Sequence, residues 1–275
     1  MPESMREIRS ILGYVPTPAE CFRLFGETER VGMARKEQEV VDRGERITFS
    51  FQEYQLVGHR WGRGPAVVML HGWGNRAAAM SAFVDPLVEQ GFSVWAIDAP
   101  AHGESSGEFC HAPLFAACTD HMVKTTVLPE CGSLQGALGY SFGGLATGIG
   151  QYRGLGAKRI ALLAPLAWIP LRFNSWAIAC GLDEAGIEEY WQHVHAYFGE
   201  GLIETHSLPQ LAPHMTAPLL LVHDRKDNEV SVQEALDVVE AWPGAVLMET
   251  EGLGHRRLLR DRTVITRVAE FLGQP

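Results

Sequence analysis

Short, almost wholly apolar runs separated by segments of helical length constrain the fold of this chain more than any other feature. Four such runs are clear, at residues 66–70, 92–97, 160–164 and 219–222. Strands that are covered on both faces have this uninterrupted apolar character, because neither side of them meets water. The helical segments between them suit crossovers between parallel neighbours. The pattern therefore predicts an α/β fold, with a mainly parallel central sheet and helices on both faces.

Hydrophobic spacing predicts the remaining elements. Further strands are expected at 47–51, 53–61, 133–139 and 245–249, and helices at 77–90, 114–128, 142–152, 235–242 and 262–272. Residues 1–35 are expected to be mostly helical, with Pro16 and Pro18 interrupting the helix and residues 19–25 resuming it. This N-terminal segment is expected to pack against the core.

One interval between two strands is much longer than a normal connection. About 50 residues separate the strand at 160–164 from the strand at 219–222, whereas such connections usually have about 2–6 residues. We expect a helical cap insertion over residues 166–217, above the carboxyl ends of the strands, where ligands bind in α/β sheets. The expected organisation is then an N-terminal extension (1–45), a core (46–165 and 218–275) and the cap.

Composition excludes several classes of protein. A chain of 275 residues with 46% hydrophobic and 20% charged residues is typical of a globular protein, not a disordered or fibrous one. A net charge of −10 argues against nucleic acid as a partner. No apolar run approaches the roughly 20 residues of a membrane span, and the N-terminus lacks the pattern of a secretory signal. The five scattered cysteines suit reduced thiols in a cytoplasmic protein.

The pentapeptide Gly-Tyr-Ser-Phe-Gly at residues 139–143 lies between an expected strand and an expected helix. A sharp strand-to-helix turn holds a serine in strained backbone angles and exposes its hydroxyl, and its neighbours come too close for side chains at the two glycines. By itself the pentapeptide can arise by chance in a chain with 29 glycines. Its position favours Ser141 as a nucleophile.

A serine hydroxyl needs a base that a third group orients, and in this arrangement the acid and then the histidine follow the serine along the chain. His255 is favoured as the base, because it is expected in a loop between the last strand and the last helix, at the same edge of the sheet as Ser141. His223 is a candidate structural neighbour. His193 and His195 face different directions on one helix and are poor co-ligands for a metal.

Two aspartates follow the strand at 219–222 and are candidates for the acid. Asp227 lies in the loop proper and is preferred, whereas Asp224, at the end of the strand, is expected to brace the turn. Asp183 and Glu184 lie inside the insertion, too far from the preceding strand to be first choices.

An oxyanion needs preorganised donors, usually two backbone N–H groups. One is expected from Phe142, after the nucleophile, and the other from Trp73, in the glycine-containing loop His-Gly-Trp-Gly that follows the strand at 66–70. A second loop, at residues 98–105, contains Asp98 and His102. These two side chains are expected to hold neighbouring loops together near the site.

Five motifs in this order, HGWG, DAPAHGES, GYSFGG, VHDRKDNEV and GLGHRRLL, resemble those of the α/β-hydrolase superfamily over roughly residues 45–274. The chain looks most like bacterial serine hydrolases whose final histidine lies in a Gly-His-Arg-Arg loop. The resemblance implies a triad of Ser141, Asp227 and His255 with the oxyanion N–H groups of Trp73 and Phe142. Two departures are structural: alanine at position 101, where glycine is usual, and serine at position 231, where proline is common.

These observations predict a carboxylesterase-like serine hydrolase that cleaves a small-molecule ester or thioester, of small to medium apolar character, through an acyl-enzyme. Its substrate pocket is expected to include His71, Trp168, Phe173 and Trp176. No cofactor and no metal are expected, and a homodimer is one expected assembly.

Three alternatives remain open from the sequence. The same triad serves carbon–carbon bond hydrolases and perhydrolases, and some members of such a fold bind ligands without catalysis. Dehalogenases and epoxide hydrolases are disfavoured, because they carry an aspartate where this chain has Ser141.

Overall fold

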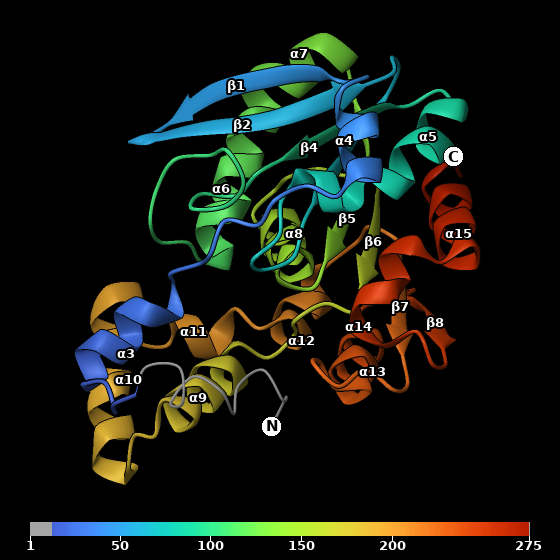
Figure 1. Ribbon diagram of the computed structural model, residues 1–275. Helices are drawn as coiled ribbons and strands as arrows, with labels where there is room; N and C mark the ends of the chain where they lie inside the picture. Colours follow the sequence, from blue (N-terminus) through green and yellow to red (C-terminus); the bar gives the residue numbers. More distant parts are fainter. Residues whose placement is uncertain (1–12, 275) are drawn as a thin grey trace.

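The computed structural model describes residues 13–274, which form one sheet flanked by helices (Figure 1). The strands are β1 (Glu45–Phe51), β2 (Tyr54–Trp61), β3 (Ala66–Leu70), β4 (Ser93–Ile97), β5 (Leu134–Tyr140), β6 (Arg159–Leu163), β7 (Leu219–Asp224) and β8 (Val246–Thr250). Their order across the sheet is β1-β2-β4-β3-β5-β6-β7-β8. β2 pairs antiparallel with β1 and β4, and all the other pairs are parallel. The predicted α/β architecture is confirmed.

Helices connect the strands and cover both faces of the sheet. They are α3 (Pro18–Phe25), α4 (Arg35–Val41), α5 (Val84–Glu89), α6 (Ala112–Met122), α7 (Leu128–Cys131), α8 (Phe142–Tyr152), α9 (Ile169–Cys180), α10 (Glu184–Phe198), α11 (Leu202–Thr205), α12 (Leu208–Leu211), α13 (Val232–Ala241), α14 (Gly254–Arg257) and α15 (Arg262–Leu272). Short 3-10 turns are η1 (Ala77–Phe83), η3 (Ala212–His214) and η4 (Leu258–Arg260), and a wider π turn is η2 (Val123–Val127).

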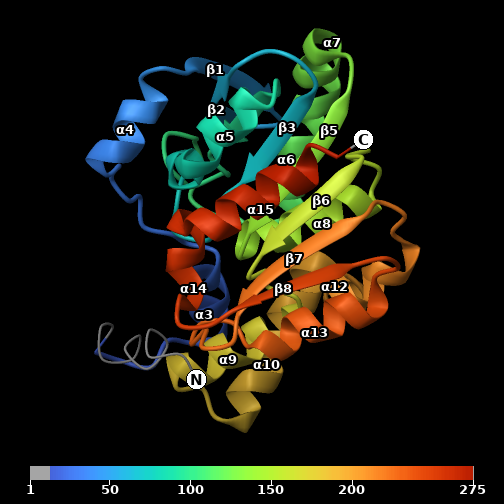
Figure 2. The same cartoon turned by 90° about the vertical axis from the view of Figure 1, so that its right-hand side faces the viewer.

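Successive side chains of β3 face two different hydrophobic layers, one on each side of the sheet. Val68 and Leu70 belong to the layer under α6, α8 and α13, whereas Val67 and Met69 belong to the layer under α5 and α15. Figure 2 shows α15 and α5 across one face of the sheet, with α6 and α8 behind it. Every residue of β3 is buried, which explains why its sequence is uninterrupted by polar residues.

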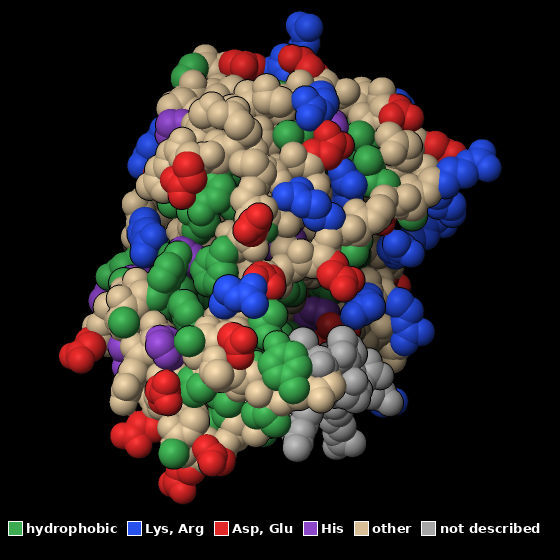
Figure 3. All heavy atoms as spheres, turned by 60° about the vertical axis from the view of Figure 1, so that its left-hand side comes forward, with side chains coloured by type: hydrophobic (Ala, Val, Ile, Leu, Met, Phe, Trp, Pro, Cys, Tyr) green, Lys and Arg blue, Asp and Glu red, His purple; other side chains and the backbone are tan. Residues whose placement is uncertain are grey.

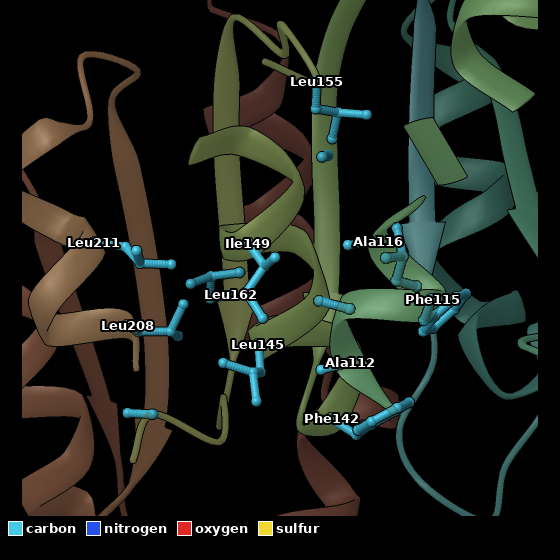
Figure 4. Packing of buried hydrophobic residues seen from close by; sticks show 14 of the residues in the cluster. Ala112, Phe115, Ala116, Phe142, Leu145, Ile149, Leu155, Leu162, Leu208 and Leu211 are labelled. Carbon is cyan, nitrogen blue, oxygen red and sulfur yellow. The ribbon is translucent and has the colours of Figure 1, made fainter. Parts of the chain in front are cut away.

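The α6–α8–α12 contact fixes the helix that follows Ser141. Figure 4 shows Leu208 and Leu211 of α12 directed toward Ile149 and its neighbours on α8, with α6 on the other side. A Cβ atom at Gly148 would lie 2.2 Å from Leu208 Cδ2, so any larger residue there would have to displace the Leu208 side chain. The close packing keeps α8, and the turn before it, in one position.

Two predicted helices differ from the structure because of prolines. The segment at 77–90 begins as the 3-10 turn η1, and the α-helix starts only at Val84. Pro86 therefore lies in the first turn of that helix, where its missing N–H costs no hydrogen bond. The helix predicted at 114–128 widens into the π turn η2 just before Pro129, which also lacks the N–H that would continue regular bonding.

The N-terminal prediction is partly wrong. Residues 1–12 lie outside the described range, residues 26–34 are not helical, and α4 was not predicted. Helix α3 begins at Pro18, after an N-cap at Thr17 whose hydroxyl and backbone exchange hydrogen bonds with Glu20. Helix α4 packs on η1 of the sheet domain, but α3 packs against α9 and α10. Helix α4 is thus placed on the sheet domain, and α3 mainly on the helices of the interval 166–217, while Gly26 accepts the backbone N–H of Cys110 at 3.0 Å.

Helices α9 to α12 occupy the interval from 166 to 217 and lie beyond the carboxyl ends of β5 and β6 (Figure 1). Hydrophobic side chains gather on the face that carries this layer (Figure 3). Leu171, Ile178 and Tyr197 are its large apolar side chains that are about half exposed. Within residues 13–274, no helix has both the length and the apolar character needed to cross a bilayer.

Candidate active site

Three side chains that are far apart in the sequence meet at the carboxyl edge of the sheet. Ser141 follows β5, Asp227 follows β7, and His255 follows β8. Ser141 Oγ lies 3.0 Å from His255 Nε2, and His255 Nδ1 lies 2.7 Å from Asp227 Oδ2. Ser141 and His255 are each 7% exposed. The structure thus brings together the three residues that the sequence singled out.

The turn at Ser141 has the strain that its sequence predicts. Ser141 has φ 53° and ψ −117°, a conformation that side-chain-bearing residues rarely adopt. A Cβ atom at Gly143 would lie 2.3 Å from the Leu70 carbonyl oxygen, and one at Gly139 would lie 2.6 Å from the Gly143 carbonyl oxygen. The two glycines are therefore required by close approaches of the backbone, as expected.

The Asp227 carboxylate is enclosed and fully hydrogen-bonded. Its Oδ1 accepts the backbone N–H groups of Glu229 at 2.8 Å and Val230 at 2.9 Å, while Oδ2 faces His255. Burial acts to raise the pKa of Asp227, but the hydrogen bond and charge of His255, followed by these two backbone donors, lower the pKa below its ordinary value. Asp227 is therefore an anion at neutral pH and orients the imidazole.

His255 lies in the one-turn helix α14, not in the open loop that we expected. Its ring packs 5.1 Å from the ring of Tyr140, whose hydroxyl donates to the His255 carbonyl oxygen at 3.4 Å. Both contacts come from the residue just before Ser141. The strand that carries the serine therefore also fixes the histidine.

Asp224, the alternative acid, braces the turn as predicted. Its two oxygens accept hydrogen bonds from the Thr250 hydroxyl at 2.7 Å and from backbone N–H groups, including Leu253 at 2.8 Å and Lys226 at 2.9 Å. Burial acts to raise the pKa of Asp224, yet these hydrogen bonds lower the pKa to about 2. The neighbouring His223 contacts the Val230 carbonyl oxygen through Nε2 at 3.0 Å, and is a structural neighbour of the acid loop.

The loop after β3 passes beside the nucleophile. A Cβ atom at Gly72 would lie 3.3 Å from Ser141 Cβ. Among residues 13–274, no acceptor is hydrogen-bonded to the backbone N–H of Trp73 or of Phe142. The two rings contact each other edge to face, with centroids 5.0 Å apart. Trp73, in the loop after β3, and Phe142, the first residue of α8, therefore both adjoin Ser141, and neither backbone N–H has an acceptor among the described residues.

Asp98 and His102 hold the next loop, as expected. Asp98 accepts the backbone N–H of Ala77 at 2.7 Å and of Glu104 at 2.8 Å, which joins two loops. His102 stacks on Phe142 at 6.1 Å, and burial lowers its pKa to about 3. Ala101 has φ 64°, so the glycine usual at this place would relieve strain.

A cavity of about 430 Å³ opens at Ser141 and His255. Phe173 and Trp176 line it as predicted, but His71 and Trp168 do not. His71 is fully buried, and the indole N–H of Trp168 donates to Asp237 Oδ2 at 2.7 Å. The cavity wall therefore contains two of the four residues that the sequence suggested for a substrate pocket.

Several lining residues were missed by the sequence reasoning. They include Phe25, His111, Arg172, Phe198 and Glu229. Phe25 comes from α3 and stacks on Phe173 of α9, with centroids 4.3 Å apart. No local pattern indicates that contact. The proline at position 113 was the available signal for His111, because proline favours the first turn of a helix and so marks the residue before it as a cap.

The two histidines of α10 have separate partners. His195 Nε2 lies 2.9 Å from Glu204 Oε1, and His193 Nε2 lies 3.9 Å from Glu189 Oε1. In the part of the chain that the structure describes, no group of three His, Cys, Asp or Glu side chains is placed to hold a metal ion.

Comparison with known families gives a partial match by sequence. The family model described as serine aminopeptidase, S33, matches residues 64–184, just under half of the chain. A pimeloyl-[acyl-carrier protein] methyl ester esterase from Methylococcus capsulatus is 30% identical over 135 residues, which cover 49% of this chain and 44% of that protein. The match therefore spans less than half of this relative.

Solved structures match over most of the chain. The esterase Pf2001 from Pyrococcus furiosus has a TM-score of 0.69 at 21% identity and covers 90% of this chain and 98% of its own. Est1E from Butyrivibrio proteoclasticus, solved with ferulic acid, has a TM-score of 0.62 at 15% identity and covers 83% and 100%. At these identities the likeness shows the fold, which is that of the α/β-hydrolases.

Proposed function

We propose that this chain, which has the α/β-hydrolase fold, is a serine esterase acting through an acyl-enzyme. The observation that carries the proposal is the continuous hydrogen-bonded chain from Ser141 through His255 to Asp227. The partial match to a methyl ester esterase supports an ester as the bond that is cleaved. We include thioesters, because the same attack applies to both.

The first half-reaction begins with proton transfer from Ser141 to His255 Nε2. The serine oxygen attacks the carbonyl carbon of the ester, and the bond to the leaving oxygen breaks as the imidazolium returns the proton to that oxygen. The alcohol leaves, and the acyl group stays on Ser141. Asp227 keeps Nδ1 protonated, so that Nε2 is free to accept the proton.

The oxyanion formed in each tetrahedral intermediate is assigned to the backbone N–H groups of Trp73 and Phe142. Each donor of this kind is worth about 2.7–4 kcal/mol in the transition state. In the second half-reaction, His255 takes a proton from water, the hydroxide attacks the acyl carbon, and Ser141 recovers its proton as the acid leaves. The lack of protein acceptors at the two N–H groups supports this assignment.

The cavity supports a small to medium apolar substrate. Aromatic side chains form much of its wall, namely Phe25, Trp73, Phe142, Phe173, Trp176 and Phe198. A volume of about 430 Å³ lies within the range of small-ligand pockets. We assign the segment at 166–217 as a cap, joined by α3 from the N-terminal extension, on the core at 46–165 and 218–275.

A fluorophosphonate and a p-nitrophenyl ester test the proposal together. The fluorophosphonate should label the peptide that contains Ser141, and p-nitrophenyl butyrate should give a burst of p-nitrophenol. Ser141→Ala should abolish both signals, whereas Ser50→Ala, at an exposed serine on β1, should change neither. Absence of labelling and of ester cleavage in the wild type would favour a ligand-binding protein instead.

A further inference from the structure

One polar side chain in the cavity wall takes no part in the proposed reaction and has an uncommitted hydrogen-bond donor. His111 precedes α6 and lines the cavity with Cys110, Ala112 and Pro113. Its Nδ1 accepts the backbone N–H of Leu114 at 3.1 Å and caps the helix. A ring nitrogen that accepts an amide N–H carries no proton, so the proton of the neutral ring is on Nε2.

The surroundings of His111 keep its ring neutral and fixed. Burial, followed by the charge of Arg153, lowers the pKa of His111 to about 4. The ring makes edge-to-face contacts with Tyr197 and Phe198, at centroid distances of 5.8 and 5.0 Å. The capping bond and these aromatic contacts fix the direction of the Nε2–H bond.

The Nε2–H group has no partner among residues 13–274, and the side chain is only partly buried. Because Nε2 is unpaired and yet is not one of the fully buried unpaired polar atoms, it is accessible. A donor that is neither paired nor sealed inside the protein can bind a molecule in the cavity. Leaving it unpaired when such a molecule displaces water would cost binding free energy.

The charged side chains of the cavity wall are already engaged, whereas the indole N–H of Trp73, like His111 Nε2, has no partner among residues 13–274. Arg172 is ion-paired with Glu234, and its unpartnered Nε is enclosed by protein. Glu229 pairs with Arg256 at 3.0 Å, and Ser141 and His255 are bonded to each other. One lining cation and one lining anion leave no net charge to favour an ionic ligand. An apolar ligand with a neutral oxygen therefore fits this wall best.

We propose that His111 is a specificity-determining residue, whose Nε2–H binds a neutral oxygen acceptor, such as an ether, hydroxyl or ketone oxygen, on the otherwise apolar group held in the cavity. This inference rests on the proposed esterase function. It narrows the substrate class from apolar esters to esters that carry one further oxygen away from the reacting carbonyl. The positive end of the α6 dipole, at the same place, also favours an oxygen there.

An oxygen scan tests the assignment. In an acyl series, p-nitrophenyl hexanoate is compared with analogues in which an ether oxygen replaces one CH₂ of the acyl chain. In an alcohol series, hexyl acetate is compared with acetates in which an ether oxygen replaces one CH₂ of the hexyl chain. For each pair, kcat/KM of the ether is divided by kcat/KM of the hydrocarbon. At one chain position this ratio should be roughly 3–10-fold higher in the wild type than in His111→Asn, the size of one neutral hydrogen bond.

His111→Asn is chosen because asparagine keeps the helix cap while it removes the ring. His111→Ser is a second variant that also keeps the cap, and the ether preference should fall in both. Because each ratio is taken within one variant, altered folding or a general loss of activity cancels. If no chain position in either series depends on residue 111, the assignment is wrong.

A binding measurement separates this inference from the proposed function. Calorimetry with Ser141→Ala should give a Kd for the preferred ether ester that is roughly 3–10-fold lower than for its hydrocarbon analogue, and His111→Asn in the same background should remove the difference. If wild type cleaves no ester but this difference is found, the esterase proposal fails and the binding assignment stands. Equal Kd values for both ligands would overturn the assignment.

Discussion

The Nδ1 atom of His71 lies 2.8 Å from the carbonyl oxygen of Gly72, the residue that follows it. Nε2 of the same ring accepts the backbone N–H of Ala99 at 3.0 Å, so the ring proton is on Nδ1 and is donated to Gly72. The peptide that carries this carbonyl ends in the N–H of Trp73. Carbonyl and N–H of a trans peptide point in opposite directions, so His71 fixes the direction of the proposed oxyanion donor.

Substitution of His71 by leucine should therefore lower kcat of ester hydrolysis more than it changes KM. We expect a loss of about 10–100-fold in kcat, less than removal of a whole oxyanion donor would cause, because the N–H remains but is less well directed. The measurement is steady-state kinetics with p-nitrophenyl butyrate.

The control for His71→Leu is His59→Leu, another buried histidine, which lies on β2. Both variants should lose stability, but only His71→Leu should lose kcat by this factor. An equal loss in both would mean that His71 supports the fold in general and not the oxyanion loop.

Replacement of Asp227 by asparagine should leave Ser141 in place, but His255 should no longer be held in the tautomer that carries its proton on Nδ1. Removal of the carboxylate in a serine protease triad lowers kcat by roughly 10⁴, and we expect a loss of about 10³–10⁴ here with little change in KM. Asp224→Asn is the matched comparison, since Asp224 ends β7 and Asp227 lies in the loop that follows it. Greater loss of kcat in Asp224→Asn would reverse the assignment of the acid.

Elements determined by local sequence could be predicted closely. The strand at 66–70 and the helices at 142–152 and 262–272 have the predicted bounds, because an uninterrupted apolar run marks the strand and a helical repeat that ends at turns or caps marks each helix. The three side chains of the candidate site could also be placed, since parallel strands carry their C-terminal loops to one edge of the sheet.

Contacts between distant segments could not be predicted. Phe25 lies in the cavity wall only because α3 packs against α9, and Trp168 is absent from the wall because α13 provides an acceptor for its indole. His71 is buried and absent from the cavity wall for a similar reason, because its Nε2 accepts the backbone N–H of Ala99. Such contacts depend on the packing of helices whose relative positions no single segment encodes.

Asp224 should make stability dependent on acid pH. Its folded-state pKa of about 2 lies below the ordinary value of 3.8. Its contribution to the free energy of unfolding is therefore complete above about pH 4 and is lost as the pH falls toward 2. Urea unfolding of wild type and Asp224→Asn should differ most at pH 5 and progressively less as the pH is lowered to 2.5. A difference that does not shrink over this interval would contradict the role of the ionised carboxylate.

The ion pair between Arg172 and Glu234 should hold the start of the cap, and a double-mutant cycle can measure it. Arg172 lies on α9, and Glu234 on α13 is 4% exposed and also accepts the backbone N–H of Ala167 at 2.9 Å. Arg172→Leu leaves a buried carboxylate without its partner and should cost about 3 kcal/mol, as should Glu234→Gln. The double variant leaves no unpaired buried charge, and the glutamine oxygen still accepts from the backbone, so it should lose less stability than either single variant. Arg35→Leu, at an ion pair whose side chains are 92% and 60% exposed, should change the free energy of unfolding by less than about 1 kcal/mol. Additive losses in the double variant would show that the pair is uncoupled, and the cap would then depend on other contacts.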